Sequence, residues 1–155
     1  MAKVGNGVQI PLSWVHEHGG AFPKNSIKAD EGVYVARCRI NDDLLVGKFV
    51  STYGKAYCPH EGKELEFTDY ELLCDSGIPG CREGYEWIMM NGGGVPDMAV
   101  VGAIDKYGTP LYIVRGRIQG ETCVGKLLQG EGSACFAWGG DEHKNPEYDV
   151  LVLRN

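Results

Sequence analysis

The sequence lacks the features that mark nucleic-acid binders and membrane-spanning proteins. It has 15 Lys and Arg against 21 Asp and Glu, a formal net charge of −6, and no basic tract. An acidic chain of this kind is a poor partner for nucleic acid or for an anionic membrane surface. No segment approaches about 18 uninterrupted apolar residues, so we expect no membrane span. The 155 residues, 43% of them hydrophobic, suit one compact domain.

An apolar stretch typical of a secretory signal is also missing from the first 20 residues. We therefore expect a cytoplasmic location and leave release by a non-classical route open. In a reducing compartment the six cysteines are expected to be free thiols. The alternative is a local disulfide between Cys74 and Cys81, which bracket a turn-rich segment.

Motifs of catalysis and metal binding are absent as well. The four histidines form no H-E-x-x-H motif and have no Cys-x-x-Cys partner, and there is no Gly-x-Ser-x-Gly elbow. The stretch GETCVGKL from Gly120 has the spacing of a phosphate-binding loop as far as Lys126. A phosphate-binding loop needs Ser or Thr next, to hold Mg²⁺, and this chain has Leu127. We expect no enzyme, no cofactor and no metal site.

Glycine and short apolar runs are abundant instead. The chain has 23 glycines, spread along its whole length, which indicates many tight turns. VYVARCRI (33–40) and LYIVRGRI (111–118) alternate with period two, as strands do. Asn41-Asp42 and Gln119-Gly120 follow these runs and predict hairpin turns. No window of 11 or more residues has a helical period, so the fold class is all-β.

The chain is a tandem duplication. The matching pairs, in the same order in both copies, are Trp14 and Trp87, Gly19-Gly20 and Gly92-Gly93, Pro23 and Pro96, VYVARCRI and LYIVRGRI, LVGKFV and CVGKLL, AYCPHEGKE and ACFAWGGDE, YELL and YDVL. The predicted organisation is an N-terminal segment (1–12), a first repeat (13–74), a linker (75–85) and a second repeat (86–154). Each repeat is too small to bury a good core alone. We expect two pseudo-symmetric antiparallel β repeats packed into one compact domain, with exchange of strands between them left open.

Val-Gly-Lys is the part of the opening motif that both copies share. A glycine in a strand marks a bulge or a close approach of backbone or ligand. Lys48 and Lys126 follow such glycines on otherwise apolar strands. A single lysine of this kind is usually a solvated surface residue, but its presence in both copies of a diverged duplication favours a function.

These residues together resemble the DM-nine repeat family, the module that also forms the amino-terminal part of natterin-like proteins. The first copy carries Trp14, Gly19-Gly20, Pro23, Asp30, Gly32, Tyr34, Arg37, Gly47-Lys48, Gly62, Glu64 and Tyr70. The second carries Trp87, Gly92-Gly93, Pro96, Asp105, Gly108, Tyr112, Arg115, Gly125-Lys126, Gly140, Glu142 and Tyr148. The match covers about nine-tenths of the chain.

The resemblance implies an intertwined antiparallel β fold and, from the family's lectins, binding of mannose or mannose-containing glycans. Its sugar-binding residues fall on Asp30 with Lys48 and on Asp105 with Lys126. The first copy is shorter between Pro23 and Tyr34. If one site is incomplete, we therefore expect it to be the first. Supporting roles next to these pairs are assigned to Glu64, Glu142, Arg37 and Arg115.

The chemistry of an Asp–Lys pair suits a hexose, whose hydroxyls both donate and accept. Asp accepts from hydroxyls and Lys donates up to three bonds, and such charge-assisted bonds are strong. Glu64 and Glu142 are equally well explained as loop carboxylates that bind backbone N–H groups. For the two arginines we favour a structural role as partners of carboxylates across the sheet. Trp14 and Trp87 are expected to fill the core, and Trp138, without a counterpart, to serve one site at most.

Two equivalent sites would give avidity on a polymannose surface, and a homodimer, which we leave open, would double their number. This suits pattern recognition in innate defence. The alternative is a protein-interaction module that binds no sugar. Natterin-like relatives join this repeat to a pore-forming domain, and we expect no pore formation from the two repeats alone.

Overall fold

The computed structural model describes residues 2–154, which form 16 strands and no helix. The all-β fold class is thus confirmed. Residues 2–154 accordingly include no helix that could cross a bilayer. The strands are β1 (Ala2–Val4), β2 (Gly7–Gln9), β3 (Leu12–His18), β4 (Lys28–Asp30), β5 (Val33–Ile40), β6 (Asp43–Val50), β7 (Lys55–His60), β8 (Lys63–Phe67), β9 (Asp69–Asp75), β10 (Tyr85–Asn91), β11 (Val101–Ile104), β12 (Pro110–Ile118), β13 (Glu121–Leu128), β14 (Ala134–Trp138), β15 (Asp141–Asn145) and β16 (Glu147–Leu153).

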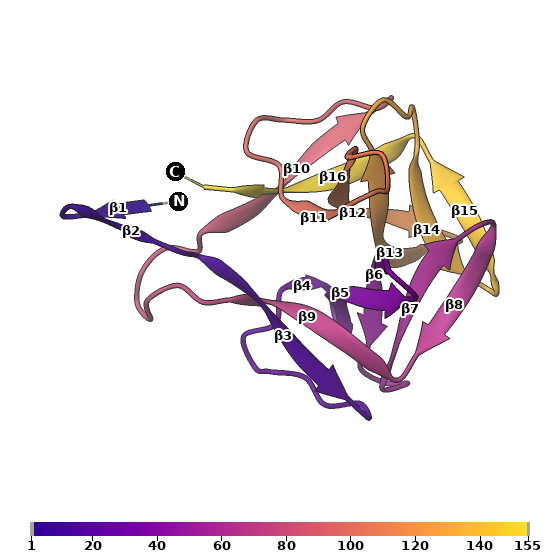
Figure 1. The fold of residues 1–155 in the computed structure, drawn as a ribbon, viewed down its shortest axis with the longest axis horizontal. Helices are drawn as coiled ribbons and strands as arrows, with labels where there is room; N and C mark the ends of the chain where they lie inside the picture. The colour runs from indigo at the N-terminus through magenta and orange to yellow at the C-terminus, as the bar shows by residue number, and fades with distance from the viewer. Residues whose placement is uncertain (1, 155) are drawn as a thin grey trace.

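One continuous antiparallel sheet of 14 strands contains everything except β1 and β2. The path β3-β9-β5-β6-β7-β8 in the first half is repeated as β10-β16-β12-β13-β14-β15 in the second, with β4 on β5 and β11 on β12. The halves meet where β8 pairs with β15, at Lys63 and Asp141. In Figure 1 this junction lies at the end of the molecule away from the termini. Among the described strands none leaves its own half, so the halves pack without strand exchange.

The hairpin turns form where the sequence predicts them. Asn41 joins β5 to β6 with φ of 53°, and Gln119 and Gly120 join β12 to β13 with φ of 51° and 78°. Asn and Gly tolerate this left-handed region, which matches the twist of a two-residue hairpin. The predicted alternation follows in β5: Ala36 and Cys38 belong to one core cluster, and Val35 belongs to another.

Three apolar clusters hold the sheet together. One lies within the first half around Phe49 and Tyr70, and one within the second half around Phe136 and Tyr148. The third is shared, because Val35, Val46 and Leu73 of the first half join their counterparts in the second half. Those counterparts are Ile113, Val124 and Leu151. Each half therefore completes its burial only against the other.

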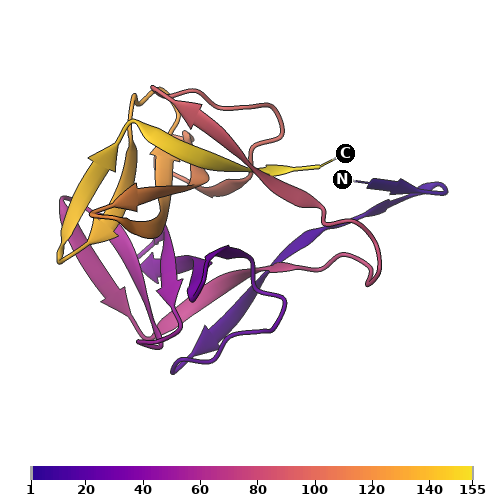
Figure 2. The same ribbon diagram turned by 180° about the vertical axis from the view of Figure 1, so that it is seen from behind.

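The N-terminal segment, for which no element was predicted, forms a two-stranded hairpin of its own. β1 and β2 pair antiparallel, with Val4 opposite Gly7 next to the turn and Ala2 opposite Gln9 at the open end. The next strand, β3, begins at Leu12. Figure 2 shows this hairpin projecting from the body of the sheet beside the C-terminus. Its side chains Val4 and Val8 are exposed, as is Ile10 beyond it.

Candidate functional site

Two cavities lie between the halves, and each contains one of the predicted Asp–Lys pairs. The Lys48 pocket, of about 590 Å³, is lined by Asp30, Lys48 and Glu64 together with Glu121, Thr122 and Trp138 of the second half. The Lys126 pocket, of about 550 Å³, is lined by Asp105, Lys126 and Glu142 together with Asp43, Leu44 and His60 of the first half. The two cavities are equivalent under the duplication. Each takes one wall from each repeat.

The glycine before each lysine explains how the lysine reaches its cavity. A Cβ on Gly47 would overlap the carbonyl oxygen of Tyr57 and stand 2.7 Å from Cys58 Sγ. A Cβ on Gly125 would overlap the carbonyl oxygen of Cys135. In both halves the next strand therefore crosses directly over the glycine, as a glycine in a strand predicts. The lysine that follows pairs with that strand, Lys48 opposite Tyr57.

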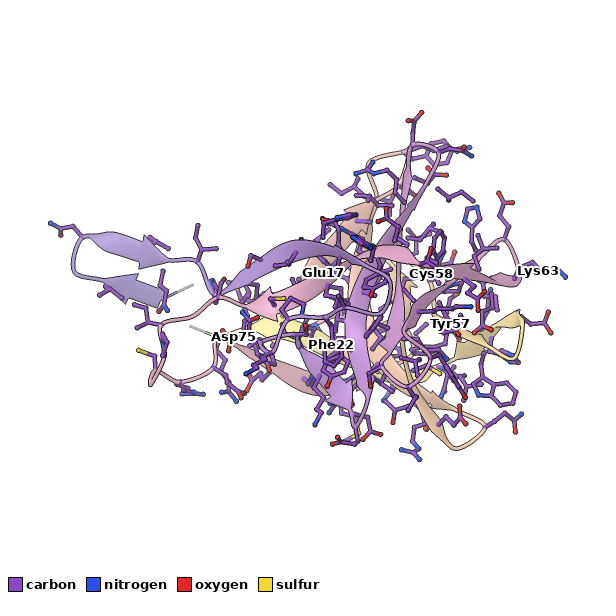
Figure 3. The ribbon with its side chains drawn as sticks, turned by 90° about the horizontal axis from the view of Figure 1, so that it is seen from below. Glu17, Phe22, Tyr57, Cys58, Lys63 and Asp75 are labelled. Carbon is purple, nitrogen blue, oxygen red and sulfur yellow. The ribbon has the colours of Figure 1, made fainter. Side chains whose placement is uncertain are left out.

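Lys48 is held by the opposite half of the chain. Its side chain is largely buried, at 7% exposure. Its Nζ donates a 2.9 Å hydrogen bond to the carbonyl oxygen of Ala137 and a 3.5 Å bond to Cys123 Sγ. It also lies 5.9 Å from the ring centroid of Tyr57. An ammonium group has three N–H donors, so one remains for a ligand in the cavity. Figure 3 shows Tyr57, which lines the Lys48 pocket, in the part of the body away from the hairpin.

Asp30 is oriented by a residue of the second half. Its Oδ2 accepts a 2.7 Å bond from the Thr122 hydroxyl, and its Oδ1 accepts a 2.8 Å bond from the backbone N–H of Glu31. These two bonds lower the pKa of the Asp30 carboxyl below its usual value, and the bond from Thr122 has the larger effect. The carboxylate is thus ionised and keeps free lone pairs. Within residues 2–154 no ion pair joins Asp30 to Lys48, although both line one cavity.

Asp105 and Lys126 are positioned differently. Asp105 Oδ1 accepts 2.9 Å bonds from the backbone N–H groups of Tyr107 and Thr109, so its own turn orients it. In the part of the chain that the structure describes, Asp105 Oδ2 and the Lys126 ammonium have no hydrogen-bond partner. Leu44 occupies the position equivalent to Thr122 and offers no hydroxyl.

Glu64 and Glu142 combine both roles that the sequence left open. Glu64 Oε1 accepts a 3.0 Å bond from the backbone N–H of Gly140, and Glu142 Oε2 accepts a 3.3 Å bond from that of Gly62. Each carboxylate thereby caps a turn of the opposite repeat. Each also lines the cavity of its own repeat.

Arg37 and Arg115 line neither cavity and act in the framework. Arg37 pairs with Glu71 at 3.1 Å and donates a 3.0 Å bond to the carbonyl of Gly102 in the other half. Arg115 repeats this with Asp149 at 2.8 Å and Ala29 at 3.1 Å. The guanidinium groups lie 4.0 Å and 4.7 Å from the ring centroids of the two duplicated tryptophans. These tryptophans, Trp14 and Trp87, pack against the shared core, as expected.

Sequence reasoning did not assign two cavity residues to their sites. Trp138 aligns with His60, but it lines the Lys48 pocket, which belongs to the other repeat. His60 correspondingly lines the Lys126 pocket. Tyr53 and Tyr57 add two more aromatic side chains to the Lys48 pocket. Alignment of the two copies pairs Trp138 with His60. It does not show that each side chain lines the cavity that contains the other repeat's lysine, because this depends on how the halves pack.

The cysteines are all unpaired, which excludes the Cys74–Cys81 disulfide. Cys74 is buried and Cys81 is exposed. Burial raises the pKa of the thiols of Cys58, Cys74, Cys123 and Cys135. Residues 2–154 contain no cluster of three or more His, Cys, Asp or Glu side chains that could hold a metal ion.

Comparisons with known proteins agree with the family resemblance and the all-β fold. A family model described as the DM9 repeat matches residues 28–145. Among solved structures, the nematode sperm cell motility protein MFP2B is similar, with a TM-score of 0.69 at 14% identity. The match covers 99% of this chain and 49% of that one, so the chain spans about half the length of this neighbour. At such low identity the likeness shows the fold alone. No curated protein matches the chain.

Proposed function

The chain belongs to the DM9 repeat family, which is known for carbohydrate-binding, lectin-like domains, and from this premise we propose that it binds mannose-type sugars. The observation that supports the proposal most strongly is the placement of the two Asp–Lys pairs. Asp30 with Lys48, and Asp105 with Lys126, each line one cavity between the halves. The family and the cavities point to a non-catalytic binding domain.

The polar groups of each cavity suit neighbouring hydroxyls on a sugar ring. The aspartate accepts hydrogen bonds and the lysine donates them, so together they serve hydroxyls that do both. Asp30 and Lys48 line the same cavity without an ion pair between them, so both groups are available to sugar hydroxyls. Bonds to charged groups are worth about 1.5–3 kcal/mol each, more than neutral ones.

Two cavities on one chain would allow bivalent attachment to a mannose-rich surface. This supports a role in pattern recognition during innate defence, and a homodimer would raise the valency further. We keep a cytoplasmic location as part of the proposal, since six unpaired cysteines suit a reducing compartment, and release by a non-classical route would bring the protein to such a surface.

Retention on mannan beads tests the proposal directly. We expect the protein to bind, to be released by free mannose, and to lose retention when both lysines are replaced in Lys48→Ala/Lys126→Ala. The matched control is Lys63→Ala, an exposed lysine outside both cavities. If the folded protein passes through the column unretained, the lectin function is wrong.

A protein-interaction module without sugar binding is the second candidate. Exposed apolar side chains favour it, with Val4 at 59% and Val8 at 56% exposure in the projecting hairpin and Ile10 at 69% just beyond it. Failure to bind mannan, together with loss of a protein partner on Val8→Ser, would support this candidate.

A further inference from the structure

We propose that Trp138 is the stacking platform of the Lys48 pocket and makes this pocket the tighter of the two sites for a neutral pyranose. The inference rests on the proposed sugar binding and goes further, since it assigns a specificity-determining residue and an order of affinity. It reverses the order expected from the shorter loop before Tyr34.

Trp138 is held rigidly at the end of β14. Its indole Nε1 donates a 2.9 Å bond to Glu121 Oε2, and its ring meets the ring of His143 edge-on at 5.8 Å. His143 Nε2 lies 2.9 Å from the carbonyl oxygen of Trp138, which ties the same two residues together a second time. A half-buried indole with its N–H already bonded offers an apolar face to the cavity. A pyranose has a face of C–H groups that fits such a surface.

The polar groups of the Lys48 pocket are fixed before any ligand arrives. Thr122 orients Asp30, and the carbonyl of Ala137 orients Lys48. The same β14 strand carries Trp138 and Ala137, whose carbonyl accepts the bond from Lys48, so the platform and the group that holds the lysine share one strand. Groups that are already ordered lose less entropy on binding, which favours affinity.

The Lys126 pocket has no indole, no threonine bound to its aspartate and no carbonyl bound to its lysine within the described residues. His60 replaces the indole, and Leu44 replaces the threonine that orients the aspartate. Tyr107 is the aromatic residue of this lining, but it is 81% exposed and Lys106 Nζ lies 5.2 Å from its ring centroid. Asp105 is oriented by its own turn, but the Lys126 ammonium has no hydrogen-bond partner among the described residues and must be ordered by the ligand itself.

Calorimetric titration of the full chain with methyl α-mannoside, followed also by tryptophan fluorescence, tests the inference. We expect two unequal sites, with the tighter one weakened about tenfold in Trp138→Ala. Trp138→Phe should retain most of the affinity but lose the fluorescence change, which separates stacking from a merely structural role. His60→Ala, the matched control in the other repeat, should leave the tighter site unchanged.

The outcomes separate the two proposals. If the wild-type chain binds no mannoside, the lectin function fails. If it binds, but Lys126→Ala removes the tighter site while Trp138→Ala, folded by circular dichroism, keeps it, the order of affinity is wrong and the lectin function stands. His60→Trp should strengthen the weaker site, and a lack of any gain would count against the indole as the determinant.

Discussion

A single methyl group at Gly125 is expected to disturb the second half of the sheet. In Gly125→Ala the new Cβ would overlap the carbonyl oxygen of Cys135 and stand 2.8 Å from Phe136 Cδ1. The oxygen belongs to the backbone of β14, so it cannot rotate away as a side chain would. β13 and β14 must therefore move apart, at the core cluster around Phe136 and beside Lys126.

Overpacking of this kind typically costs about 1–3 kcal/mol. In a domain of this size each kcal/mol lowers the melting temperature by about 2–4 °C, so we expect a decrease of about 2–12 °C. Thermal unfolding followed by circular dichroism measures it. Gly132→Ala is the control, because no atom lies within 4 Å of its Cβ and its φ is not left-handed. A Gly125→Ala melting temperature equal to that of the wild type would refute the close crossing of β13 and β14.

Three further predictions concern the framework and the titrating groups. In Arg37→Lys, the single ammonium group cannot replace both the two-nitrogen contact with Glu71 and the bond to the Gly102 carbonyl in the other half. Urea denaturation should therefore show that the free energy of unfolding falls by about 1–3 kcal/mol. Native labelling with iodoacetamide at pH 7.5 should modify Cys81 alone, because burial raises the pKa of most of the other thiols, and mass spectrometry should find one adduct. Thr122→Val should raise the pKa of Asp30 toward its ordinary value in an NMR titration. Since that pKa is lowered in the folded state, the stability it contributes is present above the unfolded value and is lost as pH falls, and Thr122→Val should lessen this acid sensitivity.

Local patterns were sufficient to predict the longer strands of each repeat and the hairpins after 33–40 and 111–118. Period-two alternation marked 33–40 and 111–118, which are β5 and most of β12. Asn41 and Gln119-Gly120 marked the turns because few residues tolerate a left-handed φ. The glycines of the two Val-Gly-Lys segments indicated the close strand crossing. Each of these features depends on neighbouring residues alone.

The packing of one repeat on the other was beyond the reach of such patterns. Nothing local to Thr122 predicts its bond to Asp30, 92 residues away, and nothing local to Trp138 places it in the Lys48 pocket. The N-terminal hairpin was missed because its strands have three residues each, too few for a periodic pattern. Alignment of the two copies paired equivalent residues, but it could not show which cavity each one enters. The domain limits and the sugar specificity stay predictions.

The crossing of the halves also explains how two copies of one site can acquire different properties. In each cavity the Asp–Lys pair comes from one repeat, and the residue at the position of Trp138 or His60 comes from the other. Position 138 lines only the Lys48 pocket, and position 60 lines only the Lys126 pocket, so a substitution at either changes one cavity alone. The arginines, by contrast, join both halves to the shared core, and a change there disturbs both cavities together. The two copies accordingly differ at positions 138 and 60 of the cavity walls, while both keep the Asp, Lys and Glu of the cavities and the Trp, Arg and acidic partner of the framework.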